Sequence, residues 1–436
     1  MSKLILALAT IGTCATSSPA QQVIWVATSE DWQNLFVDTV WDVAADGAGG
    51  VYAAGSGAWY ELMLARFDAD GNALWGHTFG HSPVYDALHG VSADGADGVV
   101  VAGTQGTFGS LHVWAGRFDA EGQQCWGGFY NQGLEAIGHD VIPDGLGGAF
   151  VVGMVGHAYV SHIDAGGDMV WFALESDEGI LRYDGAAPDG FGGFFAAGRA
   201  WHAEPDGVTD AIIVHYDADG RILDSVQFGN EIGDDAILGL EPDGEGGVIC
   251  CGYTPTGPPA HSAAFVARFD ENLDQTWIHV SDSLGDDRFE AVQPTESGDL
   301  LVAGVTSGDL FAPNAGGDDI IVARIDADGV VWSWQVGSDE DDWAYGIAPD
   351  DAGGVYVGGA TFGDLFGADK FGFGGFLLRL ACPADCNADG ALNILDFVCF
   401  QTRYQAGDPA ADCNADDVLN ILDFVCFQGL FQAGCS

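Results

Sequence analysis

The 436-residue sequence predicts an all-β fold, a seven-bladed β-propeller, followed by a small all-α module at the C-terminus. Three observations favour this fold class. Between residues 22 and 380 a motif recurs seven times at about 50 residues, the length of a four-stranded blade. The 66 glycines are about twice the usual ~7% share, as many tight turns require. Two oxygen-rich loops then occupy residues 382–436.

Residues 1–20 have the pattern of a signal peptide. Lys3 supplies the charge, Leu4 to Thr13 the apolar run, and Ser18-Pro19-Ala20 a small-residue cleavage site. The apolar run is too short to span a bilayer, and we expect no membrane span elsewhere. The protein is therefore expected to be exported, either secreted or held at the cell surface. Its 65 acidic and 12 basic residues argue against nucleic acid as a partner.

The first marker of each repeat is a D-G-x-G-G-like turn before an apolar strand. Asp-Gly favours the positive φ of a tight hairpin. The copies lie at Asp46-Gly47, Asp94-Gly95, Asp144-Gly145, Asp189-Gly190 and Asp243-Gly244, with degenerate copies at Glu296-Ser297-Gly298 and Asp350-Asp351. Seven copies predict seven blades.

Two further markers follow the turn. One is a strand, an acidic hairpin and a strand with an indole, as in Arg66-Phe67-Asp68 and Trp75. We expect the indoles to pack between blades, and the repeated arginines at 66, 117, 268, 324 and 379 to pair with turn acids. The other is an acidic loop, as in Gly233-Asp234-Asp235, Gly285-Asp286-Asp287 and Asp339-Glu340-Asp341-Asp342, for which solvated turns are favoured over cation sites.

The two ends of the repeat region complement each other. The seventh repeat ends at Leu380, one strand short of a blade. The missing strand and its indole are found in Val23-Ile24-Trp25 at the other end. We therefore expect the first strand to complete the last blade, because closure removes two exposed sheet edges.

The segment 382–436 predicts two calcium sites, each followed by a helix. Ca²⁺ takes six to eight oxygen ligands, which a twelve-residue loop supplies from positions 1, 3, 5, 7, 9 and 12. In the first loop these are Asp385, Asn387, Asp389, the backbone of Ala391, Asn393 and Asp396. In the second they are Asp412, Asn414, Asp416, the backbone of Val418, Asn420 and Asp423.

Six of the ten cysteines lie in this segment, at Cys382, Cys386, Cys399, Cys413, Cys426 and Cys435. In an exported chain they indicate a disulfide framework, although six cysteines allow 15 pairings. We favour Cys382–Cys435 with one bridge inside each repeat. A zinc site is the alternative, but the segment contains no histidine.

These motifs resemble two known families. The blade markers of residues 22–380 resemble the secreted bacterial propeller repeats called SBBP repeats, which implies the fold but little about activity. Residues 382–436 resemble a dockerin, of the kind that ends in Gly-Cys, here Gly434-Cys435. That resemblance implies the calcium ligands above and docking onto a cohesin-like or other envelope scaffold protein.

The sequence departs from the dockerin pattern in two places. Asp417 replaces the loop glycine of the second copy. Many dockerins have hydroxyl residues before the last ligand, where they help to select the cohesin. Ile394-Leu395 and Ile421-Leu422 stand there instead, so the sequence leaves the identity of the partner open.

No catalytic motif stands out, since the chain contains neither H-E-x-x-H nor G-x-S-x-G. Cys250-Cys251 is interpreted as two strand residues on opposite faces of a sheet. We expect a non-catalytic binding or interaction protein for a glycan or protein ligand, anchored through its calcium-dependent tail.

Two alternatives remain. Dockerins are often carried by polysaccharide-degrading enzymes, so the resemblance also allows a glycoside hydrolase or lyase with its site in the propeller channel. A structural surface protein without a ligand is the other. Two opposed acids in the channel would favour the enzyme, whereas an apolar or plugged channel would favour the binding platform.

Overall fold

The computed structural model describes residues 22–28, 37–57, 61–80, 86–95, 98–107, 110–130, 136–175, 179–201, 207–230, 232–257, 261–295, 297–350, 353–365, 374–382, 384–387, 392–407, 411, 413 and 418–433. The predicted signal peptide at residues 1–20 lies outside these ranges. No helix among the described residues is long and apolar enough to cross a membrane.

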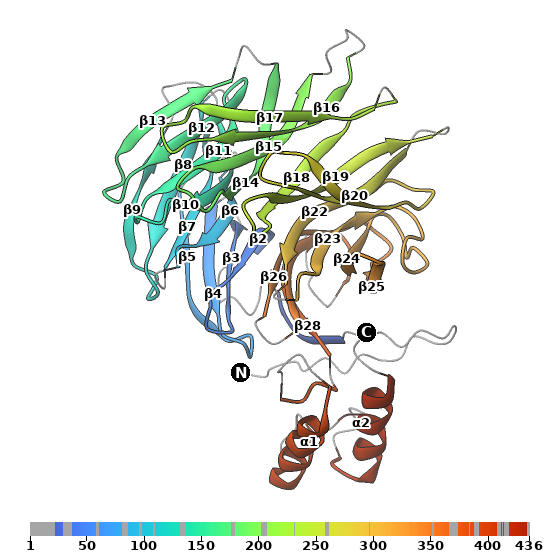
Figure 1. The fold of residues 1–436 in the computed structure, drawn as a ribbon. Helices are drawn as coiled ribbons and strands as arrows, with labels where there is room; N and C mark the ends of the chain where they lie inside the picture. The colour runs from blue at the N-terminus through green and yellow to red at the C-terminus, as the bar shows by residue number, and fades with distance from the viewer. Residues whose placement is uncertain are drawn as a thin grey trace.

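Seven four-stranded antiparallel sheets form the blades of a ring (Figure 1). Blade 1 contains β2 (Val37–Ala45), β3 (Val51–Gly57), β4 (Glu61–Phe67) and β5 (Ala73–Phe79). Blade 2 contains β6 (Ala87–Ala93), β7 (Val99–Thr107), β8 (Ser110–Phe118) and β9 (Gln124–Phe129). Blade 3 contains β10 (Ile137–Pro143), β11 (Ala149–Met154), β12 (Ala158–Ile163) and β13 (Met169–Leu174). Blade 4 contains β14 (Ile180–Pro188), β15 (Phe194–Trp201), β16 (Thr209–Tyr216) and β17 (Ile222–Phe228).

The remaining blades follow the same order. Blade 5 contains β18 (Ala236–Pro242), β19 (Val248–Thr256), β20 (His261–Phe269) and β21 (Gln275–Ser281). Blade 6 contains β22 (Asp287–Pro294), β23 (Leu300–Thr306), β24 (Asp319–Asp326) and β25 (Gly329–Val336). Blade 7 contains β26 (Asp342–Pro349), β27 (Val355–Thr361), β28 (Gly374–Ala381) and β1 (Gln22–Thr28).

The first strand closes the last blade, which confirms the prediction from the two ends of the repeat region. β1 pairs antiparallel with β28, with Val23 opposite Leu380 and Val26 opposite Leu378. Trp25 then contacts blade 1, where its Nε1 donates to the carbonyl oxygen of Ala69 at 3.0 Å. The ring is thus joined by sheet pairing on one side of β1 and by packing on the other.

The hydrophobic core is divided into seven clusters, each shared by two neighbouring blades. In one of them, Phe195 and Ile213 of blade 4 pack against Ile237 and Phe265 of blade 5. Strand residues alternate between two such clusters, because successive side chains point to opposite faces. Cys250 and Cys251 show this, since each is fully buried in a different cluster, as predicted.

The strand indoles connect neighbouring blades, as predicted. Nε1 of Trp75 in blade 1 donates to the carbonyl oxygen of Ala120 in blade 2 at 2.8 Å. Its ring lies over Gly122 of the same hairpin, where a Cβ atom would approach the ring to 2.7 Å. The same arrangement joins Trp25 to Gly71 and Trp171 to Gly220. The hairpin glycine therefore provides both the positive φ of the turn and the space for the indole.

Four of the five repeated arginines pair with turn acids that the structure describes. The Nε–Oδ2 distances of Arg66–Asp46, Arg117–Asp94, Arg324–Asp299 and Arg379–Asp350 are 2.9, 2.7, 2.7 and 2.8 Å. Arg268 instead donates to the carbonyl oxygen of Gly298 in blade 6. In blades 3 and 4, His162 and His215 contact Asp144 and Asp189 from the corresponding strand.

The acidic loops are solvated turns only in part, because their leading acids Asp234, Asp286, Asp339 and Glu340 are exposed whereas the last acid of each loop is not. Their last residues, Asp235, Asp287 and Asp342, are buried and accept hydrogen bonds from the backbone of their own loops. The preceding acids bind the start of an adjacent strand, as Asp234 does with the amide and hydroxyl of Thr209 at 2.8 and 3.0 Å. The prediction of solvated turns is therefore wrong for the last acid of each loop, whose carboxylate is solvated by backbone amides rather than by water.

The C-terminal module contains two helices, α1 (Ile394–Ala406) and α2 (Ile421–Ala433), which lie outside the ring (Figure 1). Asn393 caps α1 through a capping box with Asp396. Phe400 and Phe427 stack between the helices with ring centroids 4.2 Å apart. A single small cluster, with Cys386 and Ala411, is the buried core of the described part of this module.

Candidate site in the channel and candidate calcium loops

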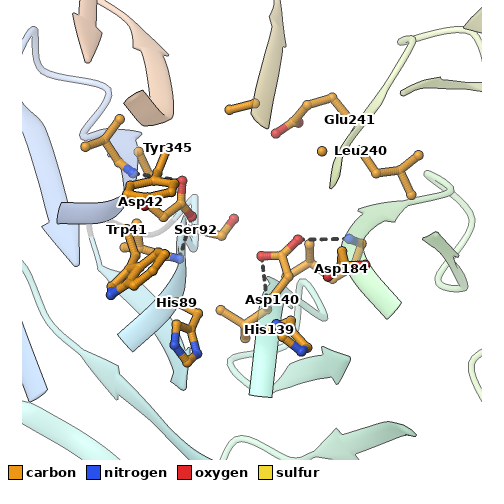
Figure 2. Close-up of a pocket in the computed structure, with 18 of the residues that line it drawn as sticks. Trp41, Asp42, His89, Ser92, His139, Asp140, Asp184, Leu240, Glu241 and Tyr345 are labelled. Atoms are coloured by element: carbon orange, nitrogen blue, oxygen red, sulfur yellow. Dashed lines mark hydrogen bonds between the residues drawn. The ribbon is translucent and has the colours of Figure 1, made fainter. Parts of the chain in front are cut away.

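The innermost strands of all seven blades surround a cavity of about 840 Å³ in the centre of the ring. This volume lies within the range of about 300–1,000 Å³ typical of small-molecule sites. Figure 2 shows side chains from several blades projecting toward the same opening. The cavity is the main candidate for a functional site on the propeller.

A β-bulge in each inner strand supplies one lining residue per blade. The register shifts occur at equivalent places, for example between Val40 and Asp42 in β2 and between Leu88 and Gly90 in β6. The residues at the bulges are Trp41, His89, His139, Asp184, Leu238, Glu290 and Tyr345, and all seven line the cavity. A bulge re-aims a side chain, which explains why this position faces the channel.

These seven residues were not predicted from the sequence, although a signal for them exists. Each bulge residue stands five positions before the first residue of the blade's turn, as Trp41 does before Asp46 and His89 before Asp94. The spacing is constant, but the residue type varies from blade to blade. A search for a repeated residue type therefore passes over the position.

One side of the channel is aromatic. The rings of Trp41 and Tyr345 have centroids 4.5 Å apart, and those of Trp41 and His89 are 5.5 Å apart at 76°. The ring of His89 in turn lies next to that of His139, with centroids 5.9 Å apart. His89 uses Nδ1–H to donate to the carbonyl oxygen of Gly138 at 2.9 Å. Four neighbouring blades thus form a continuous aromatic wall.

The two channel histidines are held in the neutral form. Burial lowers the pKa of His89, and the charge of Arg182 acts in the same direction. Burial lowers the pKa of His139 further, together with the neighbouring His89, Arg182 and Arg199. The aromatic wall therefore carries no positive charge near neutral pH.

Two of the channel acids are paired with arginines. Asp184 accepts from Arg182, with Nε–Oδ2 at 3.0 Å and Nη2–Oδ1 at 2.7 Å. Glu290 forms an ion pair with Arg288, which likewise stands two residues earlier in the same strand. These pairs keep both arginines occupied within their own strands.

Three other carboxyl groups form no ion pair with any described residue. Asp42 accepts from the amides of Val43 and Val91, both at 2.8 Å, and Asp140 from those of Val141 and Ala186 at 2.7 and 2.8 Å. In each case the second amide belongs to the next blade. Glu241 accepts from Nε2 of Gln293 at 2.5 Å.

Burial raises the pKa of all three carboxyl groups. The pKa of Asp140 rises to about 7, because its burial outweighs its two backbone hydrogen bonds. Burial raises the pKa of Asp42 well above its usual value, and the charge of Asp140 adds to it. The pKa of Glu241 rises through burial and the charges of Asp140 and Asp42. The three groups therefore act on one another across the channel.

A plugged or apolar channel was expected for a simple binding platform, but this channel is neither plugged nor apolar. It contains acids from different blades, although Asp42 and Asp140 each hold two backbone amides. Those hydrogen bonds give both aspartates a structural role in joining neighbouring inner strands. Glu241 also lacks an ion pair with any described residue, but its described hydrogen bond comes from the side chain of Gln293 and not from a backbone amide.

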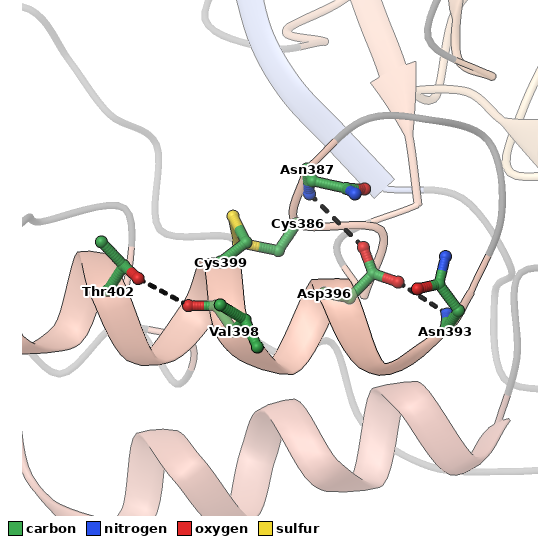
Figure 3. The surroundings of a disulfide bond; sticks show 7 residues. All are labelled: Cys386, Asn387, Asn393, Asp396, Val398, Cys399 and Thr402. Carbon is green, nitrogen blue, oxygen red and sulfur yellow. Dashed lines mark hydrogen bonds between the residues drawn. A yellow bond between two sulfur atoms is a disulfide. The ribbon is translucent and has the colours of Figure 1, made fainter.

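The structure describes seven of the twelve predicted calcium ligands. They are Asp385, Asn387, Asn393, Asp396, Val418, Asn420 and Asp423, whereas Asp389, Ala391, Asp412, Asn414 and Asp416 lie outside the described residues. Asp396 is fully buried and accepts from the backbone of Asn393 at 2.7 Å and of Asn387 at 3.4 Å (Figure 3). Asp423 is equally buried and accepts from the amide of Asn420. Asp396 thus joins the first loop to the start of α1, and Asp423 binds the residue directly before α2.

Each loop is joined to its helix by a disulfide. The sulfur atoms of Cys386 and Cys399 lie 2.10 Å apart and those of Cys413 and Cys426 lie 2.01 Å apart (Figure 3). Each repeat therefore contains one bridge of its own, as favoured from the sequence. Cys382 is also disulfide-bonded, and its expected partner Cys435 lies outside the described residues.

Comparison with known proteins supports the fold. No protein-family model and no curated protein matches the chain. The WD40 domain of Neurospora crassa Pan2 is similar over 82% of this chain and 95% of that domain, with a TM-score of 0.50 and 11% identity. At that identity the similarity concerns the β-propeller fold alone.

Two other solved structures are more distant. A protein of unknown function from Bacteroides caccae has a TM-score of 0.38 and 13% identity, and covers 68% of this chain and 97% of its own. The WD40 β-propeller domain of Doa1 has a TM-score of 0.33 and 14% identity, with coverages of 66% and 95%.

Proposed function

We propose that the protein is an exported, non-catalytic binding platform, in which the propeller holds a ligand and a calcium-dependent, dockerin-like tail docks onto a cohesin-like or other scaffold protein. The fold is compatible with the SBBP-type repeats that the blade motifs resemble. The tail connects the platform to an extracellular or cell-surface assembly.

The observation that carries the docking role is an exposed apolar surface on both helices. On α1 it consists of Ile394, Leu395 and Val398, which are 70%, 53% and 54% exposed. On α2 the equivalent residues Ile421, Leu422 and Val425 are 68%, 54% and 59% exposed. A small module has little reason to expose six large apolar side chains at matching positions unless a partner covers them. The apolar character also suits a partner other than a cohesin that reads hydroxyl groups.

The residues present fit calcium. Side chains of Asp and Asn and backbone carbonyls are the hard oxygen ligands that Ca²⁺ prefers, and the segment offers no histidine for zinc. Asp396 and Asp423 would hold the ion from the helix side of each loop. Calcium would then neutralise clustered carboxylates and stabilise the folded tail.

Hydrogen exchange on the full-length protein tests the calcium dependence. Removing calcium with a chelator should accelerate exchange in α1 and α2 and leave the blades unchanged. Asp396→Asn should reduce the calcium effect on α1, whereas Asp70→Asn, an exposed acid on the propeller, should not. Equal exchange with and without chelator would refute the calcium-dependent tail.

A second candidate is a polysaccharide hydrolase with its site in the channel. The observation in its favour is the raised pKa of Glu241 and Asp140, because a general acid must keep its proton near neutral pH. Release of reducing sugar from a polysaccharide panel, abolished in Glu241→Gln, would establish the enzyme in place of the non-catalytic platform.

A further inference from the structure

We propose that the central channel binds an organic cation, an alkylammonium group held between the aromatic wall and the carboxyl groups of Asp42, Asp140 and Glu241. This inference deepens the proposed binding function and rests on it, since it names the chemical class of the ligand.

The charge balance of the channel favours a cation. Asp184 is compensated by Arg182 and Arg199, and Glu290 by Arg288, but Asp42, Asp140 and Glu241 form no ion pair with a described residue. Buried carboxyl groups near one another disfavour ionisation, and a bound cation relieves that penalty. The net charge of −53 also attracts cations toward the protein.

The spacing of these groups favours a polyatomic cation over a metal ion. Among the described residues, no group of three or more His, Cys, Asp or Glu side chains is close enough to hold a metal. The three carboxyl groups nevertheless influence one another electrostatically. A ligand larger than a single ion can lie between them.

The aromatic wall favours an alkylammonium group. Trp41 and His89 meet at 76°, and Tyr345 lies against the other side of the indole, so the rings form a corner (Figure 2). Aromatic faces arranged in this way attract ammonium groups through cation–π interactions. The neutral state of His89 and His139 removes the repulsion that protonated rings would cause.

A separate observation indicates that the channel is built around a polar ligand. Thr104 lines the cavity and is 1% exposed, yet its hydroxyl oxygen has no hydrogen-bond partner in the described part of the chain. Trp41 Nε1 and His139 Nε2 line the same cavity and lack partners too. Buried polar groups are usually paired, so a ligand with a hydroxyl group next to its ammonium would suit the site.

Isothermal titration of the full-length protein with choline chloride tests the proposal. The matched probe is 3,3-dimethylbutan-1-ol, which has the same shape without the charge, and should bind at least about tenfold more weakly. Glu241→Gln removes the carboxyl group that ionises when the cation binds, and should weaken choline binding about tenfold. Glu245→Gln changes an exposed acid of the same blade and should leave the affinity within about twofold.

Three results would overturn the inference: no choline binding at about 10 mM, equal binding of the uncharged probe, or an unchanged affinity in Glu241→Gln. Trp41→Leu, checked for an unchanged melting temperature, should weaken choline binding, and full retention of affinity would also contradict the site. Cellobiose is titrated in parallel. Binding of cellobiose without choline would reject the cation and retain the binding platform, so the two failures can be told apart.

Discussion

The propeller and the C-terminal module differ in what holds them together. In the propeller, seven apolar clusters and repeated Trp and Arg contacts join each blade to the next. The C-terminal module has, among its described residues, one small cluster around Phe400 and Phe427 and two disulfides, together with two loops suited to calcium. The difference teaches that a ring distributes its stability over many equivalent contacts, whereas a small module depends on a few covalent or ionic links.

Opening the ring should have the largest effect. We expect a chain that begins at residue 29, and so lacks β1, to lose more than about 5 kcal/mol of propeller stability, because β28 loses its partner strand and blade 1 loses Trp25. Thermal unfolding measures the change. A chain that begins at Gln21 is the control and should melt like the full-length protein. Equal melting temperatures for both truncations would show that β1 does not close the ring.

The stability of the ring and the calcium affinity of the tail should depend on pH in opposite directions. A buried acid with a raised pKa binds its proton more tightly in the folded state, so its contribution to stability falls as pH rises from about 4 to about 7. For Asp140, whose pKa rises from 3.8 to about 7, the loss is about 4 kcal/mol. Asp42 and Glu241 across the channel act in the same direction. The calcium affinity of the tail should instead rise with pH over the same range, because carboxylates must be ionised to bind calcium.

The measurement is denaturant unfolding of the propeller at several pH values. Asp140→Asn should flatten the decline with pH, even though it also loses an acceptor for the amide of Val141 or Ala186. Asp70→Asn, in an exposed hairpin, should keep the full slope. A propeller equally stable at pH 4 and pH 7 would contradict the raised pKa of Asp140.

Breaking a disulfide should affect only the tail. Replacing both Cys386 and Cys399 by Ser should cost the tail about 3 kcal/mol, because the bridge closes a short loop onto α1. Hydrogen exchange should accelerate in α1 and remain unchanged in the blades. Cys125→Ser, which removes an exposed free thiol of blade 2, is the control. Faster exchange in the blades of the double variant would mean that the two regions are coupled.

The sequence predicted the ring because its blade markers repeat with the same residue types. Trp75, Arg66 and the Asp46 turn were each assigned the contact that the structure shows. The last acid of each acidic loop was misjudged because sequence does not tell whether water or a backbone amide solvates a carboxylate, as for Asp287. Hydrophobicity and charge were therefore sufficient for the fold, but not for every polar contact.

The channel site could not be predicted in the same way. Its residues occupy one repeated position but range from Trp41 to Leu238 and Glu290, and only the bulge reveals that they converge. Their chemistry depends on burial, which raises the pKa of Asp140 and lowers that of His139. Neither burial nor convergence across blades is visible in a motif. The calcium ligands, by contrast, follow one another within twelve residues, which is why the sequence could propose them.

The smallest expected effect concerns one contact between blades. Gly220 has a φ of +77°, and a Cβ atom there would approach the ring of Trp171 to 2.8 Å. Gly190 in the same blade has a φ of +77° with nothing within 4 Å. Gly190→Ala therefore measures backbone strain alone, about 1 kcal/mol, whereas Gly220→Ala adds steric conflict with the indole and should cost about 2 kcal/mol more.

Denaturant unfolding of the two glycine variants gives the difference, and a Trp171→Ala background tests its cause. Without the indole, the additional cost of Gly220→Ala should disappear, because the two residues are in contact and their effects are not additive. If the additional cost persisted without the indole, the backbone conformation of the turn, and not the indole contact, would be what requires glycine in the hairpin. The indole contact would then follow from the closure of the ring and would not help to hold it together.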